Sequence, residues 1–291
     1  ERIANRQLFF ILFIIRSILS ISTLPALASA DAAQDAWISI LLVFLPVALL
    51  LTWLLAALGT RFPCQSFVQY SITIMGPWLG RAVAAIYLWV FLFYAALEVR
   101  IYAAVIITGF LPETPLVFIV STMIFTSAVA AYLGIEVIGR MADILFPFFI
   151  ITVLLTIFLP LPLADPGNLQ PVLARGWAPV IRGALNPIGN IVQLSLLAFF
   201  TPSLVRPRRS IPWILGALVA STLLGAASVA VVVMIKGPSE GARAAYPLLS
   251  MVRAVRISPF LERAEALTIF AWGLAVFISL AAYIFAGARG M

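Results

Sequence analysis

Long apolar runs separated by short polar stretches repeat along the whole chain, a pattern typical of helices that cross a membrane. The runs are continuous rather than alternating, which excludes a porin-like β-barrel. The eight predicted spans cover residues 7–28, 36–58, 82–111, 115–133, 144–160, 186–205, 211–235 and 259–286. Between them we predict a short interfacial helix within 63–80, a charged connector at 134–143, an extended loop with a short helix at 161–185, and an outer loop at 236–258 with an amphipathic helix at 246–255.

The first span contains a proline that interrupts its helix. Pro25 lacks an N–H, so the carbonyl of Ile21 loses its helical partner, and the ring biases Leu24 away from helical angles. An unsatisfied backbone group in hydrocarbon costs several kcal/mol, so such a break persists only where it lines a protein cavity or binds something. Arg16, Ser20 and Thr23 recur at i, i+4 and i+7 and give this helix one polar face.

The sixth span has a matching irregularity. Pro187 and Gly189 weaken its first turns, and Asn186, Asn190 and Gln193 fall at i, i+4 and i+7 on one face. The bland interpretation of each break is an ordinary kink in a membrane helix. The coincidence of two breaks with two polar faces favours a binding site instead.

Two interrupted spans at matching places in two halves indicate a five-plus-five inverted-repeat, LeuT-like transporter fold with the ligand held between the breaks. The whole chain, 1–291, then forms a single transmembrane domain, with the first repeat at 1–160 and a partial second repeat at 161–291. Free N–H groups at one half-helix end suit a carboxylate, and free carbonyls at the other suit an ammonium. An amino acid offers both charges, so we predict a small zwitterion as ligand. The predicted binding residues are Ser17, Ser20, Ile21, Ser22, Thr23, Asn186, Gly189, Asn190 and Gln193.

Composition supports this class and excludes several others. Of the 291 residues, 64% are hydrophobic and 10% are charged, which is typical of a polytopic membrane protein. Histidine is absent and Cys64 is the single cysteine, so the residues offer no metal site, no internal disulfide and no histidine-based catalysis. No phosphate-binding loop, nucleophile elbow or dinucleotide fingerprint is present. We therefore expect no enzyme, no cofactor and no catalytic residue, and no cleavable signal peptide in the first apolar run.

The net charge of +7 comes from arginines at the ends of spans, which indicates a topogenic role rather than nucleic-acid binding. With the N-terminus in the cytoplasm, the inner segments carry nine arginines, and the short outer loops carry only acidic residues. The strongest inner cluster is Arg206, Arg208 and Arg209.

Two charges lie deep inside predicted spans. Arg16 is about 14 Å along its helix from Gln7, too deep to reach the surface easily, so it needs a partner inside the bundle. Glu98 in the third span is the candidate, and we predict that the two side chains pair near the cavity floor. The pair would either fix helix docking or take part in the ligand response.

Motifs along the chain resemble the endospore germination permeases, the B subunits of spore germinant receptors in the amino acid–polyamine–organocation superfamily. They are Gln7-Leu-Phe-Phe, Ser17 before Leu24-Pro25, Gln34-Asp-Ala-Trp37, Arg61-Phe-Pro63, Leu111-Pro-Glu-Thr-Pro115, Gly134-Ile-Glu-Val-Ile-Gly-Arg140, Phe146-Pro147, Pro171-Val-Leu and Phe260-Leu-Glu262-Arg263-Ala-Glu265 with Trp272. The resemblance implies ten membrane helices, a place in the spore inner membrane, amino acids as germinants, and partners in an A subunit and a lipoprotein C subunit.

The chain departs from that family in three ways. Eight spans are predicted instead of ten, so the last two helices of the second repeat are expected to be missing. Serine stands at Ser17 or Ser20 where the family has glycine, which narrows a cavity. Gln193 stands where members often carry glutamate, which weakens proton coupling at that position.

Three functions remain open from the sequence. The first is a ligand-sensing subunit of a germination receptor in the spore inner membrane or cell membrane. The second is a secondary transporter of amino acids, with or without proton coupling. The third is a structural or ion-conducting subunit that binds no nutrient.

Overall fold

The computed structural model describes residues 2–63, 65–244, 246–254 and 264–290, and for residues 19–21, 249, 252–254, 264, 265 and 290 it describes the backbone alone. Within these residues the regular structure is helical. A single parallel β-bridge joins Ile3 to Leu204. The all-α prediction is therefore confirmed.

The first half of the described chain forms eight α-helices with two short irregular helical turns among them. They are α1 (Asn5–Ser22), α2 (Leu24–Ala32), η1 (Ala33–Asp35), α3 (Ala36–Ile38), the π-helix η2 (Ser39–Phe44), α4 (Leu45–Arg61), α5 (Phe67–Met75), α6 (Pro77–Gly109), α7 (Leu116–Tyr132) and α8 (Ile135–Phe158).

The second half is more irregular, because 3₁₀ turns interrupt its helices. It contains η3 (Leu161–Leu163), η4 (Pro166–Leu169), α9 (Trp177–Ile188), η5 (Gly189–Ser195), α10 (Leu196–Phe200), η6 (Thr201–Ser203), η7 (Pro207–Arg209), α11 (Ile211–Arg243), α12 (Pro247–Ala254) and α13 (Ala264–Gly290). Gly237, with φ 72°, interrupts α11 just beyond the predicted end of its span, in a conformation that glycine adopts readily.

Six helical segments of the described chain are long and apolar enough to cross a membrane. They are Leu24–Arg61, Pro77–Gly109, Ile135–Leu163, Trp177–Ser203, Ile211–Arg243 and Ala266–Arg289. Two shorter helices, α1 with 18 residues and α7 with 17, correspond to the first and fourth predicted spans. Each of the eight predicted spans thus has a helical counterpart.

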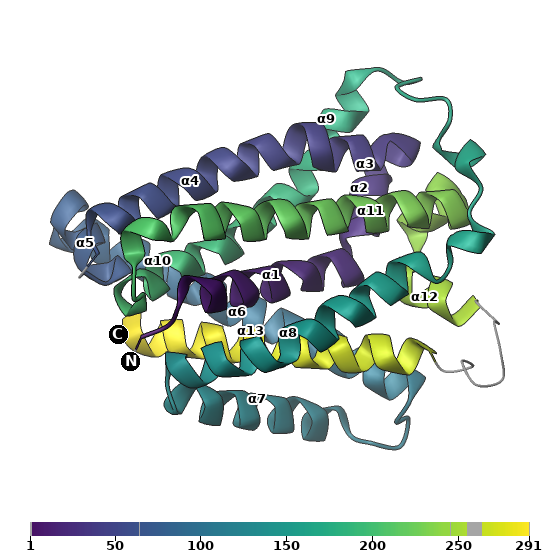
Figure 1. Ribbon diagram of the computed structural model, residues 1–291. Coiled ribbons are helices and arrows are strands. Elements are labelled where there is room, and N and C mark those ends of the chain that lie inside the picture. The colour runs from purple at the N-terminus through teal and green to yellow at the C-terminus, as the bar shows by residue number, and fades with distance from the viewer. Residues whose placement is uncertain (1, 64, 245, 255–263, 291) are drawn as a thin grey trace.

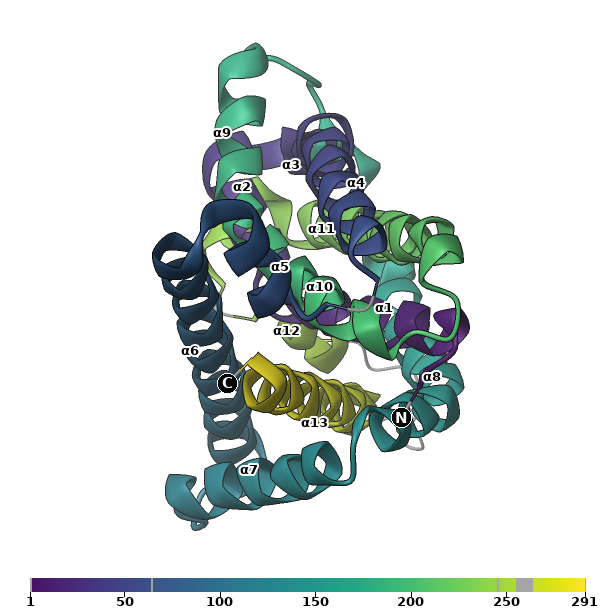
Figure 2. The ribbon, with the colours of Figure 1, turned by 90° about the vertical axis from the view of Figure 1, so that its left-hand side faces the viewer.

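Helix α1 is the axis of the bundle. It packs against α11 on one side and against α8 and α13 on the other, and Figure 1 shows it between these groups. Viewed from the end that carries both chain termini, α6 and α7 form an outer edge and α13 lies inside them (Figure 2). Helix α13 accordingly contacts α6, α7 and α8.

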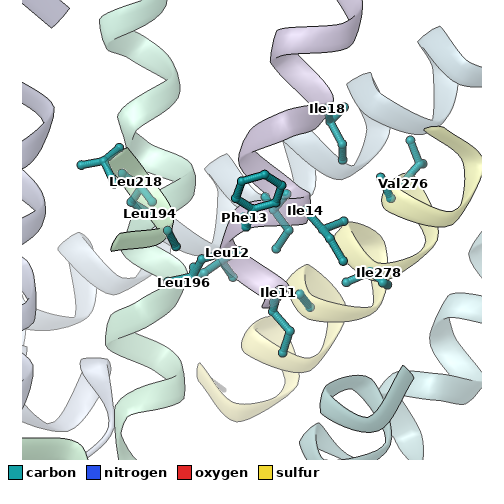
Figure 3. Close-up of a cluster of buried hydrophobic side chains, with 14 of the residues drawn as sticks. Ile11, Leu12, Phe13, Ile14, Ile18, Leu194, Leu196, Leu218, Val276 and Ile278 are labelled. Carbon is teal, nitrogen blue, oxygen red and sulfur yellow. The ribbon is translucent and has the colours of Figure 1, made fainter. Parts of the chain in front are cut away.

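The sequence of α1 explains its central place. Every residue from Ile11 to Ile18 is buried, so the helix is apolar around its whole circumference except at Arg16 and Ser17. A helix that is hydrophobic all round belongs in the interior of a bundle. Figure 3 shows its side chains in one buried cluster with Leu194 and Leu196 of the interrupted sixth span, Leu218 of α11, and Val276 and Ile278 of α13.

Some predicted boundaries are wrong. The charged stretch 134–143 is not a connector, because Gly134 caps α8 and residues from Ile135 onward are already helical. The second predicted span begins where α3 does, at Ala36, but the π-helix η2 interrupts its α-helix before α4. The interfacial helix within 63–80 is confirmed as α5, which Ser66 and Gln69 begin with a capping box. The start of the eighth predicted span, including Glu262 and Arg263, lies outside the described residues.

Candidate functional site

A cavity lies where the breaks of the first and sixth spans face α6 and α13. Its empty space is about 390 Å³, of which the centre of a water molecule can reach about 50 Å³. One water needs at least about 10–15 Å³ of such space, so the cavity has room for a few waters or one small molecule. The lining residues are Ile18, Ser22 and Thr23 from the first span, Tyr94, Leu97, Glu98 and Ile101 from α6, Asn190 and Gln193 from η5, and Trp272 from α13.

The first wall is the break between α1 and α2. Thr23 separates the two helices with φ −124° and ψ −16°, and it makes no side-chain cap hydrogen bond to α2. Pro25 stands within the first two positions of α2, where a missing N–H costs little. The break predicted from Pro25 is confirmed, and it turns the positive, N-terminal end of α2 toward the cavity.

The second wall is η5, the tightened stretch that follows α9. It starts at Gly189, two residues after Pro187. The hydroxyl of Tyr94 on α6 donates to the Gly189 carbonyl at 3.2 Å and to Asn190 Oδ1 at 3.1 Å. The predicted irregularity of this span is confirmed, and Tyr94 ties it to α6.

Glu98 is the one ionisable carboxylate among the lining residues, and it is 7% exposed. Its Oε1 accepts from Gln193 Nε2 at 3.0 Å and from the Tyr283 hydroxyl at 3.2 Å. Its Oε2 accepts from the Ser279 hydroxyl at 2.5 Å. These three donors are all neutral. A carboxylate offers about four lone-pair positions, so acceptor capacity remains.

The predicted ion pair between Arg16 and Glu98 is wrong. Arg16 is 5% exposed and donates from Nη1 to the Asn190 carbonyl at 3.0 Å, and its guanidinium lies 5.6 Å from the centre of the Phe44 ring. No ion pair within 4.0 Å joins it to Glu98, although both side chains are described. Both side chains instead form hydrogen bonds to η5, Arg16 to the carbonyl of Asn190 and Glu98 to the side chain of Gln193.

Two buried polar atoms of the lining side chains lack a hydrogen-bond partner among the described residues. Gln193 directs its amide nitrogen to Glu98, which leaves its Oε1 unpaired, and the Nε1 of Trp272 is also unpaired. Arg16 Nε and the Ser17 hydroxyl, which belong to residues outside the lining, are also buried without a hydrogen-bond partner. An unpaired buried polar group carries a desolvation penalty of about 1–3 kcal/mol, so a polar ligand that pairs with such atoms gains affinity.

Four of the nine predicted binding residues line the cavity: Ser22, Thr23, Asn190 and Gln193. Ser17 is fully buried behind the lining. Gly189 contributes only its carbonyl to Tyr94. The side chains of Ser20 and Ile21 lie outside what the structure describes.

Asn186 does not face the cavity. It is exposed and donates to Asp31 Oδ2 at 2.9 Å and to the Leu27 carbonyl at 3.4 Å. The i, i+4, i+7 relation with Asn190 and Gln193 fails because the helix tightens into η5 after Ile188, which rotates the later side chains away from the face of Asn186.

The sequence prediction placed Glu98 near the cavity floor but missed the other contributions of α6 and those of α13. Tyr94, Leu97, Glu98 and Ile101 recur at i, i+3, i+4 and i+7, which is one face of α6. On α13, Ser279 and Tyr283 are four residues apart and both bond to Glu98. An intramembrane carboxylate with polar residues at helical spacing on another span was the available signal.

Among the described residues, no three or more aspartate, glutamate, cysteine or histidine side chains come together in a group that could hold a metal ion.

A search of solved structures finds the same fold in a LeuT-type transporter. The crystal structure of MhsT in complex with L-phenylalanine superimposes with a TM-score of 0.68, covering 96% of this chain and 72% of MhsT at 17% sequence identity. At this identity the likeness establishes the fold, and it confirms the predicted LeuT-like architecture.

Curated relatives come from spore-forming bacteria. Spore germination protein KB of Bacillus subtilis (strain 168) is 27% identical over 297 residues, covering 99% of this chain and 78% of the relative. Spore germination protein YndE of the same organism is 24% identical, covering 92% of this chain and 74% of the relative. The family profile described as "Spore germination protein" matches residues 2–291. The chain therefore belongs to the spore germination protein family.

Proposed function

We propose that this protein is the nutrient-sensing membrane subunit of a spore germination receptor, and that it binds a small amino acid in the cavity between the two broken spans. The observation that carries the proposal is the position of the cavity. It lies at the helix breaks of the first and sixth spans, and its lining holds the buried carboxylate of Glu98 together with unpaired polar atoms.

The two ends of the cavity suit the two charges of an amino acid. Glu98 and the unpaired Gln193 Oε1 are acceptors, which match the donors of an ammonium group.

At the other end, the N-terminus of α2 at Thr23 carries positive dipole charge, and the Trp272 Nε1 is a free donor. A carboxylate placed there would be favoured by both. The ligand would therefore lie with its ammonium toward Glu98 and its carboxylate toward the break of the first span.

The comparison supports an amino acid as ligand, and the size of the cavity supports a small one. The structural neighbour MhsT was solved with L-phenylalanine. The space open to a water centre in this cavity is only about 50 Å³, which favours smaller side chains such as that of alanine.

A panel of common amino acids, screened by the thermal unfolding of detergent-solubilised protein, tests the proposal. One or a few small amino acids should raise the unfolding midpoint, and Asn190→Ala should abolish the rise. Asn186→Ala is the matched control, because Asn186 lies outside the cavity on the same span, and it should preserve the rise. A flat panel with the folded protein would contradict the proposal.

The second candidate is a secondary transporter of amino acids, which the LeuT-like fold favours. Counterflow in proteoliposomes separates the two. Binding without exchange of labelled amino acid supports a sensor, and rapid exchange by the isolated protein supports a transporter.

The cellular setting is part of the same proposal. Family membership suggests the spore inner membrane and partners in a receptor A subunit and a lipoprotein C subunit. The arginine-rich ends of the spans favour a cytoplasmic N-terminus.

A further inference from the structure

A group of arginines surrounds a hollow far from the cavity, at the end of the bundle that carries both chain termini. Two open depressions meet there and share Arg206 and Arg209. One has a volume of about 500 Å³ and is lined by Pro63 and residues 206–209. The other has a volume of about 470 Å³ and is lined by residues 4–6, Val205, Arg206, Arg209 and Trp213. We call the site formed by Arg6, Arg206, Arg208 and Arg209 the arginine hollow.

The backbone of the arginine hollow is held in place. Ile3 N donates to the Ser203 carbonyl at 2.8 Å, and Val205 N donates to the Ile3 carbonyl at 3.1 Å, so the N-terminal segment and the 201–210 segment form one bridge. Asn5 Nδ2 donates to the Arg206 carbonyl at 3.3 Å. The arginines therefore project from an ordered framework, which lowers the entropy lost when they bind a partner.

The charge of the arginine hollow is largely uncompensated. Arg6 forms an ion pair with Asp143 at 3.2 Å. Arg206, Arg208 and Arg209 are exposed, and no described carboxylate lies within 4.0 Å of any of them. Among the residues that the structure describes, none of those lining either depression is acidic. Guanidinium groups match phosphate oxygens with paired hydrogen bonds, so the site fits a phosphate-bearing anion.

Apolar surface beside the arginines shows which kind of anion fits. Trp213 and Val205 line the same depression and are 43% and 51% exposed. Trp213 lies in the first turn of α11, a 33-residue apolar helix that is long enough to cross a membrane. Tryptophan at such a place belongs at the level of lipid headgroups, and basic pockets at this level bind anionic headgroups.

We propose that the arginine hollow binds the phosphate headgroup of an anionic phospholipid, with Trp213 and Val205 against the upper part of its acyl chains. A free phosphate ion would satisfy the arginines but would leave these two apolar side chains without a contact.

Thermal unfolding in detergent with added lipid tests this proposal. Phosphatidylglycerol should raise the unfolding midpoint by several degrees more than phosphatidylcholine with the same acyl chains, and added NaCl should reduce the difference. Native mass spectrometry should show phosphatidylglycerol retained on the protein. Inorganic phosphate at the same concentration should have little effect.

The variant R206Q/R208Q/R209Q should lose the preference for phosphatidylglycerol. The matched control R175Q/R182Q/R243Q removes three exposed arginines outside the hollow and should keep it. If the first variant does not fold, R208Q alone should reduce lipid retention at least twofold, and the comparison of headgroups on the unmodified protein still applies. Equal effects of the two lipids would overturn the proposal and point to an acidic protein partner. An equal effect of inorganic phosphate would show a free anion site instead of a lipid site.

Discussion

Replacing Glu98 with glutamine tests how the cavity recognises its ligand. The variant keeps the size of the side chain but removes its charge. Glutamine can still accept from Gln193 and Tyr283 and can donate to the Ser279 oxygen, so the network that now holds Glu98 has partners in the variant. We therefore expect Glu98→Gln to fold and to retain the cavity.

The expected effect falls on affinity. A hydrogen bond to a charged group contributes about 1.5–3 kcal/mol, and each ~1.4 kcal/mol is a factor of ten. If the ligand ammonium contacts Glu98, the variant should bind its amino acid about 10- to 150-fold more weakly. Calorimetric titration measures this directly, using the amino acid identified by thermal unfolding.

Two comparisons make the result specific. The deaminated analogue of the same amino acid should bind weakly to the unmodified protein and should be indifferent to Glu98→Gln. Ser127→Ala removes a bond to the Phe277 carbonyl on α13 outside the cavity and should leave affinity unchanged. Unaltered affinity of the Glu98→Gln variant for the amino acid would refute the assigned orientation.

Three further substitutions follow from the packing. Tyr94→Phe removes the hydroxyl that ties α6 to η5, and the loss of about 0.5–1.5 kcal/mol should weaken ligand binding about 2- to 12-fold in the same titration. Gly183→Ala would place a Cβ 2.7 Å from that of Ala32, so its thermal unfolding midpoint should fall by the equivalent of about 1–3 kcal/mol. Gly287→Ala meets nothing within 4 Å and should not lower the midpoint, which makes it the control. In the unmodified protein the hydroxyls of Thr156 and Thr268 are 2.7 Å apart and form a buried hydrogen bond between α8 and α13. Thr156→Val removes this partner of Thr268 and should lower the free energy of unfolding by about 1–3 kcal/mol. An unchanged unfolding midpoint would show that the bond contributes nothing to stability.

The two breaks could be predicted from the sequence because proline acts on its own helix. Pro25 determines the break at Thr23 through its missing N–H, and Pro187 with Gly189 weakens the helix before η5. These are local effects, so they need no knowledge of the neighbouring helices. Asn190 and Gln193 could be predicted as lining residues for the same reason, because they lie inside the tightened stretch η5 itself.

The partner of Arg16 could not be predicted from depth alone. Depth along a helix says how far a residue lies from the membrane surface, but the direction of its side chain depends on how the helix is rotated in the bundle. Arg16 faces the Asn190 carbonyl and Phe44, while Glu98 faces α13. The Asn190 carbonyl is a backbone acceptor, which no side-chain pattern in the sequence reveals.

Asn186 illustrates the limit of regular periodicity. The prediction assumed 3.6 residues per turn from Asn186 to Gln193. The seven residues directly after Ile188, Gly189–Ser195, instead form the 3₁₀ stretch η5. Pro187 and Gly189 predicted a break in this helix. A break also interrupts the 3.6-residue periodicity, so residues before and after it need not share one helical face.

Protection of position 23 from chemical labelling tests the central claim most directly. In a Cys64→Ser background, Thr23→Cys places a thiol on the cavity wall at the break of the first span. The amino acid that stabilises the protein should slow the reaction of this thiol with a small methanethiosulfonate reagent, with a half-maximal effect at its dissociation constant. A ligand that binds to this variant, as shown by calorimetry, but leaves the labelling rate unchanged would place the binding site elsewhere.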